Sequence, residues 1–247
     1  MNDRPSLFQF SQGRHRDVRL IAGIDLAQPF LTNHAAIGLD EVGPAAADYP
    51  LVFLKDAESG RLRLTALFGL TPGLNTYVFN DMWQAVYLPL AISAAPFCLA
   101  GPQHTLCIDE RSPRVTTDTG DALFHDDGSE TATLERIRST LGQLAEGQKA
   151  ADGLVDTLLT LDLLRPLTVA AQFVTGAEQE IQGLYSINPQ LLRQLESAAL
   201  LDLHAHDHLP AVYTIIQSLN QFNRIRQLHN LGSGPEITAF RFVMGST

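Results

Sequence analysis

The order of hydrophobic and polar positions changes character about half-way along the chain. Up to about residue 115 it consists of short apolar stretches separated by turn residues, a pattern typical of β-strands. The stretches 49–55 and 61–69 flank a polar turn, and apolar and polar side chains alternate in the second, as in a strand with one buried face. The stretches 96–100 and 105–109 indicate another hairpin around a short loop.

From residue 130 onward, apolar side chains recur every three or four positions, which predicts a long helix. This apolar stripe begins at Leu134, and Thr131 or Thr133 is suited to cap the helix N-terminus. We expect Pro166 to end the helix after Arg165. Three glycines within it weaken the helix, so a bend or break is compatible with the sequence.

The last third of the chain predicts one more hairpin, two helices and a strand. The hairpin comprises 167–174 and 179–187, and Asn188 with Pro189 is the pattern of a helix N-cap and first turn. A further helix is expected over 208–229. The final apolar stretch, "ITAFRFVM", reads as a strand.

Strands first and helices later favour an α+β fold over alternating βαβ units. We therefore predict an N-terminal, mostly antiparallel β region followed by a long helix, a β-hairpin and C-terminal helices. The length of 247 residues suits a single domain over 1–247, with a subdivision into a β-rich part, 1–129, and a helical part with a hairpin, 130–247, as the alternative.

Charge and composition exclude several classes of protein. A net charge of −10 repels phosphate backbones, which argues against nucleic-acid binding. The sequence contains no apolar run of the roughly 20 residues that a membrane span needs. Two cysteines, Cys98 and Cys107, are expected to be free thiols, with a bridged hairpin as the alternative. Together with the lack of a secretory signal pattern, this favours a cytoplasmic location, and association with the cell envelope or with a second copy stays open.

The stretch "LHAHDHLP" is the clearest candidate for metal chemistry. His204, His206 and His208 could bind Zn or Fe, with Glu196 or Asp207 assisting. The motif is one residue short of the metallo-β-lactamase pattern and lacks the glutamate of the zincin pattern. The favoured interpretation is a junction between two helices in which Asp207 caps the second, and no cofactor is predicted.

A second candidate lies at the end of an apolar strand in "CIDERSP". Asp109 and Glu110 are adjacent there and are followed by Arg111 and Arg114. Paired acids can perform acid–base chemistry, but a solvated strand end with weak ion pairs is the commoner arrangement.

Two aromatic residues, Trp83 and Tyr87, could line a pocket for an apolar or aromatic ligand, although packing in the β region is favoured. The acidic stretch at 125–127 could bind a hard cation, with an acidic turn as the favoured alternative. The sequence contains no Gly-x-Ser-x-Gly, P-loop or Gly-x-Gly-x-x-Gly motif.

Several segments in order along the chain resemble the SapC family of bacterial proteins, which is named for a surface-array locus and differs from the membrane-spanning permease of the same short name. The segments are "HRDVRL" at 15–20, "AADYPLVFLKDAESG" at 46–60, "LFGLTPGLNTYVF" at 67–79, "PFCLA" at 96–100, "LCIDERSPRV" at 106–115, "GDALFHDDGSETATLERI" at 120–137, "LLRPLTV" at 163–169, "IQGLYSIN" at 181–188 and "LHAHDHLPAVYTIIQSLNQF" at 203–222.

The resemblance implies an accessory role in surface-layer biogenesis or outer-membrane uptake, in gene neighbourhoods that include flavin-dependent halogenases. It assigns no catalytic residues, and of the three histidines only His204 matches the family pattern. Residues 93–95 depart from the Arg-rich stretch that precedes Pro-Phe in the family, so the resemblance implies no anion site at those positions.

Three functions follow as hypotheses. We favour a non-catalytic accessory or binding protein that acts on a protein partner or a small-molecule ligand, the ligand lying near Trp83 and the end of the "CIDERSP" strand. A metal-dependent enzyme built on the histidine cluster and a structural surface-layer component are the alternatives.

Overall fold

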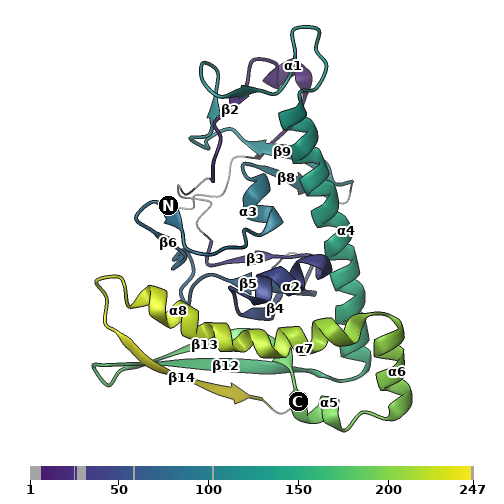
Figure 1. Cartoon of the computed structure of the whole chain (residues 1–247), viewed down its shortest axis with the longest axis vertical. Coiled ribbons are helices and arrows are strands. Elements are labelled where there is room, and N and C mark those ends of the chain that lie inside the picture. Colours follow the sequence, from purple (N-terminus) through teal and green to yellow (C-terminus); the bar gives the residue numbers. More distant parts are fainter. Residues whose placement is uncertain (1–6, 25, 27–31, 58, 102, 246–247) are drawn as a thin grey trace. The chain divides into compact units, whose positions relative to one another are not determined.

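The computed structural model of the chain describes residues 7–24, 26, 32–57, 59–101 and 103–245. They form two compact units, each assembled from two separate stretches of chain. The first unit comprises 1–31 and 88–145, and the second comprises 32–87 and 146–247. The long helix α4 (Ala132–Thr160) contributes residues to both (Figure 1). The expectation of a single domain stays a prediction.

The first unit contains two small antiparallel sheets and two short helices besides its part of α4. Its elements are β1 (Leu7–Gln9), α1 (Gln12–His15), β2 (Arg19–Leu20), α3 (Leu90–Ala94), β8 (Phe97–Ala100), β9 (Thr105–Asp109), β10 (Val115–Thr116) and β11 (Asp121–Ala122). The strand orders are β1-β9-β8 and β10-β2-β11. Apolar side chains from both sheets and from α4 share one core, formed by Phe10, Leu20, Ala94, Phe97, Leu106, Ile108, Leu123, Phe124, Leu134, Ile137 and Leu141.

The second unit is built on a six-stranded sheet of order β14-β12-β13-β4-β5-β3, in which every pair is antiparallel. Helices α7 and α8 lie along one face of this sheet (Figure 1), where the Phe222 ring contacts that of Phe240. The elements are β3 (His34–Ala36), η1 (Leu39–Glu41), α2 (Val42–Ala46), β4 (Leu51–Lys55), β5 (Leu62–Leu67), β6 (Val78–Phe79), β7 (Met82–Trp83), β12 (Leu164–Phe173), β13 (Glu178–Ile187), α5 (Pro189–Arg193), α6 (Ser197–Ala205), α7 (His208–Ser218), η2 (Leu219–Gln221), α8 (Phe222–His229) and β14 (Ile237–Met244).

The α+β class is confirmed, with antiparallel sheets in the N-terminal half followed by α4, the β12–β13 hairpin and C-terminal helices. The three predicted hairpins form as β4–β5, β8–β9 and β12–β13. Asn188 caps α5 as expected, because its side chain accepts hydrogen bonds from the backbone N–H groups of Gln190 and Leu191. The final strand has the predicted bounds.

The predicted end of the long helix is wrong. Helix α4 ends at Thr160, where Asp162 adopts a left-handed conformation with φ of 53°. The N–H groups of Asp162 and Leu163 donate to the carbonyls of Leu159 and Leu158, which is the Schellman arrangement that terminates helices. The helix therefore ends six residues before Pro166.

Pro166 lies inside β12 instead of after a helix. Its carbonyl accepts a hydrogen bond from the N–H of Gly245, just past the last residue of β14. The nitrogen and the carbonyl of a strand residue point to the same side, so the missing N–H faces the end of the neighbouring strand. The proline removes at most the last bond of this ladder, beyond the final residue of β14, which is why the strand tolerates it.

The C-terminal helices are shorter than the sequence predicts. The helix expected to follow Asn188 without a break is divided into α5 and α6, because Glu196 has an extended backbone with ψ of 150°. The helix expected over 208–229 consists of α7 and α8 joined by the 3-10 turn η2.

One glycine of α4 marks a close approach between backbones in the second unit. A Cβ at Gly147 would lie 2.3 Å from Oδ1 of Asp40 and 3.0 Å from the Cα of Gly38. A Cβ at Gly38 would in turn lie 2.8 Å from the Cα of Gly147. Only glycines allow η1 and α4 to pack at this distance.

We expect Gly147→Ala to lower the free energy of unfolding by about 1–3 kcal/mol, because the added methyl group overpacks the contact with Gly38. Gly153→Ala is the matched control: it lies in the same helix, is exposed and has no atoms within 4 Å of the new methyl, so it should stabilise the protein by up to about 1 kcal/mol. Urea unfolding measures both. Equal stabilisation by the two substitutions would contradict the close approach.

Candidate functional site

The three clustered histidines lie at a junction between two helices. His204 is in the last turn of α6, His206 follows its end, and His208 begins α7. Asp207 occupies the position before α7 with φ of 56°, but its side chain forms no capping hydrogen bond, so the predicted capping role is wrong. Nδ1 of His206 lies 2.9 Å from the carbonyl oxygen of Asp202, a contact within the turn.

The geometry of this junction gives the metal hypothesis no support. Among the described residues, no group of three or more His, Cys, Asp or Glu side chains lies close enough together to hold a metal ion. The rings of His206 and His208 are 6.0 Å apart, and Glu196, the suggested assisting ligand, precedes α6 at its other end. Burial lowers the pKa of His208. Binding of Zn or Fe by His204, His206 and His208 stays a prediction.

The aromatic residues proposed as pocket lining belong to a packed hydrogen-bonded network in the second unit. Nε1 of Trp83 donates to the Tyr49 hydroxyl at 2.9 Å, and this hydroxyl donates to the Tyr87 carbonyl. The Tyr87 hydroxyl donates to Oε1 of the buried Glu41 at 2.9 Å. The Trp83 ring packs edge-on against Phe68. These contacts direct the polar atoms of Trp83 and Tyr87 inward and provide a structural role for both.

The carboxylate of Asp109 organises the turn after β9. Asp109 is completely buried, and its Oδ1 accepts a hydrogen bond from the backbone N–H of Arg111 at 3.0 Å. Nε of Arg111 lies 3.5 Å from the same oxygen. A carboxylate without solvent access that holds the following turn is suited to structure rather than to acid–base exchange with a substrate.

Glu110, the neighbour of Asp109, belongs to a different cluster that the sequence did not predict. Its carboxylate accepts two hydrogen bonds from the Arg14 guanidinium, at 2.6 and 3.0 Å, and lies 3.0 Å from Nε2 of the buried His15. The bond to Arg14, followed by that to His15, holds the pKa of Glu110 below its ordinary value. Phe10 stacks on the His15 ring with centroids 4.9 Å apart. The cluster thus joins α1 to the end of β9.

Arg114 lies beside a pocket within the first unit. The pocket has a volume of about 210 Å³ and receives residues from five separate stretches of this unit. It is lined by Leu20, Ala22, Gly23, Ser93, Ala94, Ala95, Arg114, Asp121, Thr133, Arg136 and Ile137. Trp83 and Tyr87 belong to the other unit, so this pocket is formed without the aromatic residues that the sequence suggested.

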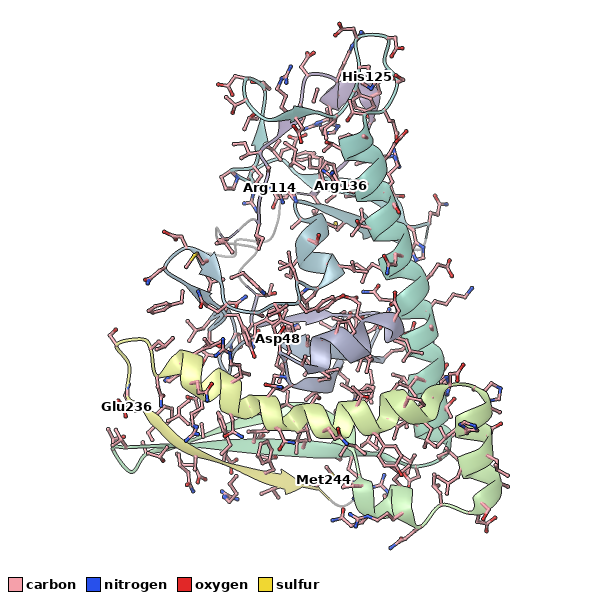
Figure 2. The ribbon with its side chains drawn as sticks, viewed as in Figure 1. Asp48, Arg114, His125, Arg136, Glu236 and Met244 are labelled. Atoms are coloured by element: carbon pink, nitrogen blue, oxygen red, sulfur yellow. The ribbon has the colours of Figure 1, made fainter. Side chains whose placement is uncertain are left out.

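Two guanidinium groups give the pocket its chemistry, and Figure 2 labels both. Nε of Arg114 donates to the carbonyl of Ile21 at 2.9 Å, and its Nη1 donates to the carbonyl of Ala95. The exposed guanidinium of Arg136, in contrast, has no hydrogen-bond or ion-pair partner among the described residues. It is therefore the cation that is free to bind a ligand.

The remaining polar groups of the pocket come from β11, α3 and the first turns of α4. Asp121 accepts a hydrogen bond from the Thr133 hydroxyl at 3.3 Å, and Ser93 supplies a second hydroxyl. Helix α4 begins at Ala132, so the positive end of its dipole lies close to Thr133. The described part of the lining contains no histidine or cysteine.

Sequence reasoning identified Arg114 but missed Arg136 and Asp121. A signal was present in the spacing: Thr133, Arg136 and Ile137 are three and four positions apart and share one face of a helix. Ile137 is buried, whereas Arg136 itself is exposed.

The two cysteines are free and lie directly opposite each other on β8 and β9. Burial is the main cause that raises the pKa of Cys98 to about 11, with smaller contributions from Cys107 and Asp109. A thiol with a raised pKa is almost entirely protonated at neutral pH and is a poor nucleophile.

We therefore expect alkylation of Cys98 by iodoacetamide to be slow at pH 7 and to accelerate about tenfold for each pH unit until the pH approaches about 11. Mass spectrometry of a Cys107→Ser variant, sampled over time at several pH values, follows Cys98 alone. A rate that levels off near pH 8 would contradict the raised pKa.

Comparison with known proteins identifies the family but no characterised relative. A family model of SapC matches residues 10–225. No curated protein and no solved structure matches the chain. Among the described residues, no helix combines the length and the apolar composition that crossing a membrane requires. The match covers most of the sequence and both units, and the chain belongs to the SapC family.

Proposed function

We propose that this SapC-family protein is a non-catalytic binding protein that holds a small, negatively charged molecule in the pocket lined by Arg114 and Arg136. The observation that carries the proposal is the placement of two guanidinium groups in one small pocket, one held by backbone carbonyls and the other without a partner among the described residues. An arginine in a concave site is a strong and geometrically specific receptor for a carboxylate.

The cellular role belongs to the same proposal. An accessory function in surface-layer biogenesis or outer-membrane uptake, a cytoplasmic location and a protein partner rest on the sequence and on the family resemblance. Binding of a small anion is compatible with such a role, since an accessory protein can sense or deliver a metabolite without converting it. No observation on the described residues favours the metal-dependent enzyme or the structural surface-layer component.

Arg136→Gln should weaken the binding of small carboxylates at least tenfold, because the substitution removes the unpaired cation while keeping a polar side chain at the position. Isothermal titration of the whole chain with 4-methylpentanoate at pH 7 measures the loss.

Arg138→Gln is the matched control. Arg138 lies in the same helix but pairs with Glu130 and does not line the pocket, so this variant should bind as the unmodified protein does. Equal affinities of the Arg136 and Arg138 variants would overturn the proposed function.

A further inference from the structure

We infer that the ligand of this pocket is a small aliphatic α-amino acid, whose carboxylate is bound by Arg136 and whose ammonium group is bound by Asp121. The inference rests on the proposed function and adds the second charge and the side chain of the ligand. It follows from three features of the pocket: its balance of charges, its size and the nature of its walls.

The charges in the pocket are mixed. Asp121 lines the same small space as Arg114 and Arg136. One of its oxygens accepts the Thr133 hydroxyl, and the other has no hydrogen-bond partner among the described residues. A ligand with a negative charge only would place that charge close to the Asp121 carboxylate, and the repulsion would offset part of the attraction to the guanidinium groups. A ligand that also carries an ammonium group pairs with both.

The two arginines have different roles in this arrangement. The guanidinium of Arg114 donates to the carbonyls of Ile21 and Ala95, and its own carbonyl accepts from the N–H of Ile21 at 2.9 Å. Arg114 is therefore a positioning residue that connects two walls of the pocket. Arg136 has no such bonds among the described residues and is the group that contacts the ligand carboxylate.

The size of the pocket limits the ligand to a small molecule, and the few apolar residues of its lining are suited to contact an aliphatic side chain. The volume of about 210 Å³ is below the roughly 300–1,000 Å³ of pockets for drug-sized molecules. Leu20, Ala94 and Ile137 belong to the hydrophobic core and supply the apolar part of a lining whose accessible surface is otherwise mostly polar. No aromatic side chain lines it among the described residues, so stacking does not contribute. An aliphatic side chain of the size of that of valine or leucine matches these walls.

The test compares L-leucine with two analogues of nearly equal shape, by isothermal titration of the whole chain at pH 7. In 4-methylpentanoate the amino group is absent, and in L-leucinamide the carboxylate is replaced by a neutral amide. We expect L-leucine to bind at least tenfold more tightly than either analogue, because each analogue leaves one charged group of the pocket without a partner.

Asp121→Asn separates the inference from the proposed function. This variant should bind L-leucine at least tenfold more weakly than the unmodified protein and 4-methylpentanoate at least as tightly. Asp118→Asn is the control, because Asp118 lies nearby in sequence, is exposed and does not line the pocket. Far-ultraviolet circular dichroism and the melting temperature verify that each variant is folded.

The possible failures are distinguishable. If the unmodified protein binds 4-methylpentanoate as tightly as L-leucine, the amino-acid inference is overturned and the anion pocket stands. If L-leucinamide binds as tightly as L-leucine, or if neither carboxylate binds, the proposed function is overturned and the inference with it. Binding of L-leucine that Asp121→Asn leaves unchanged also overturns the inference.

Discussion

The hydrogen bonds from the Arg114 guanidinium to two backbone carbonyls are the contacts on which the proposed binding site depends. Ile21 follows β2 and Ala95 follows α3, so a single side chain fixes two segments that are more than seventy positions apart in the sequence. Charge-assisted bonds of this kind are stronger than neutral ones. Because Arg114 is occupied in this way, the pocket keeps its shape and the binding of a ligand falls to Arg136.

The hydrophobic core of the first unit provides the rest of the framework. Leu20, Leu123 and Ile137 bring β2, the residues after β11 and the start of α4 into one core, and the exposed Asp121 and Arg136 lie on the same segments. The charged groups of the pocket therefore lie on segments whose apolar side chains are buried beside them. Opposite charges can line one pocket in this arrangement without the burial of an unpaired ion.

Much of the fold could be predicted because the signals for it are local. The alternation in 61–69, the cap at Asn188 and the apolar run of β14 each depend on neighbouring residues, and each is confirmed. Two errors have different causes. The effect of Pro166 depends on where the distant strand β14 ends, whereas the end of α4 depends on a local feature, the left-handed Asp162.

The candidate site was harder to predict, for the same reason. The sequence singled out Arg114 and the histidines because they lie in dense polar stretches, but it gave Arg136 and Asp121 no special status. They line the same pocket because β11 pairs with β2 and because of where the N-terminus of α4 lies. Neither feature can be recognised from a short sequence motif. Packing was the favoured interpretation of Trp83 and Tyr87, and their hydrogen bonds give both a structural role, while ligand binding by these residues stays a prediction.

The most direct test of the account is to observe the two guanidinium groups during a titration with L-leucine, by nitrogen-15 NMR of their Nε–H resonances. The Nε–H of Arg114 should be protected from exchange with water both before and after L-leucine is added, since it already donates to the carbonyl of Ile21. The Nε–H of Arg136 should exchange rapidly with water in the free protein and become protected and shifted when the ligand binds. A resonance of Arg136 that stays unchanged at saturating ligand would contradict the central claim that this residue binds the carboxylate.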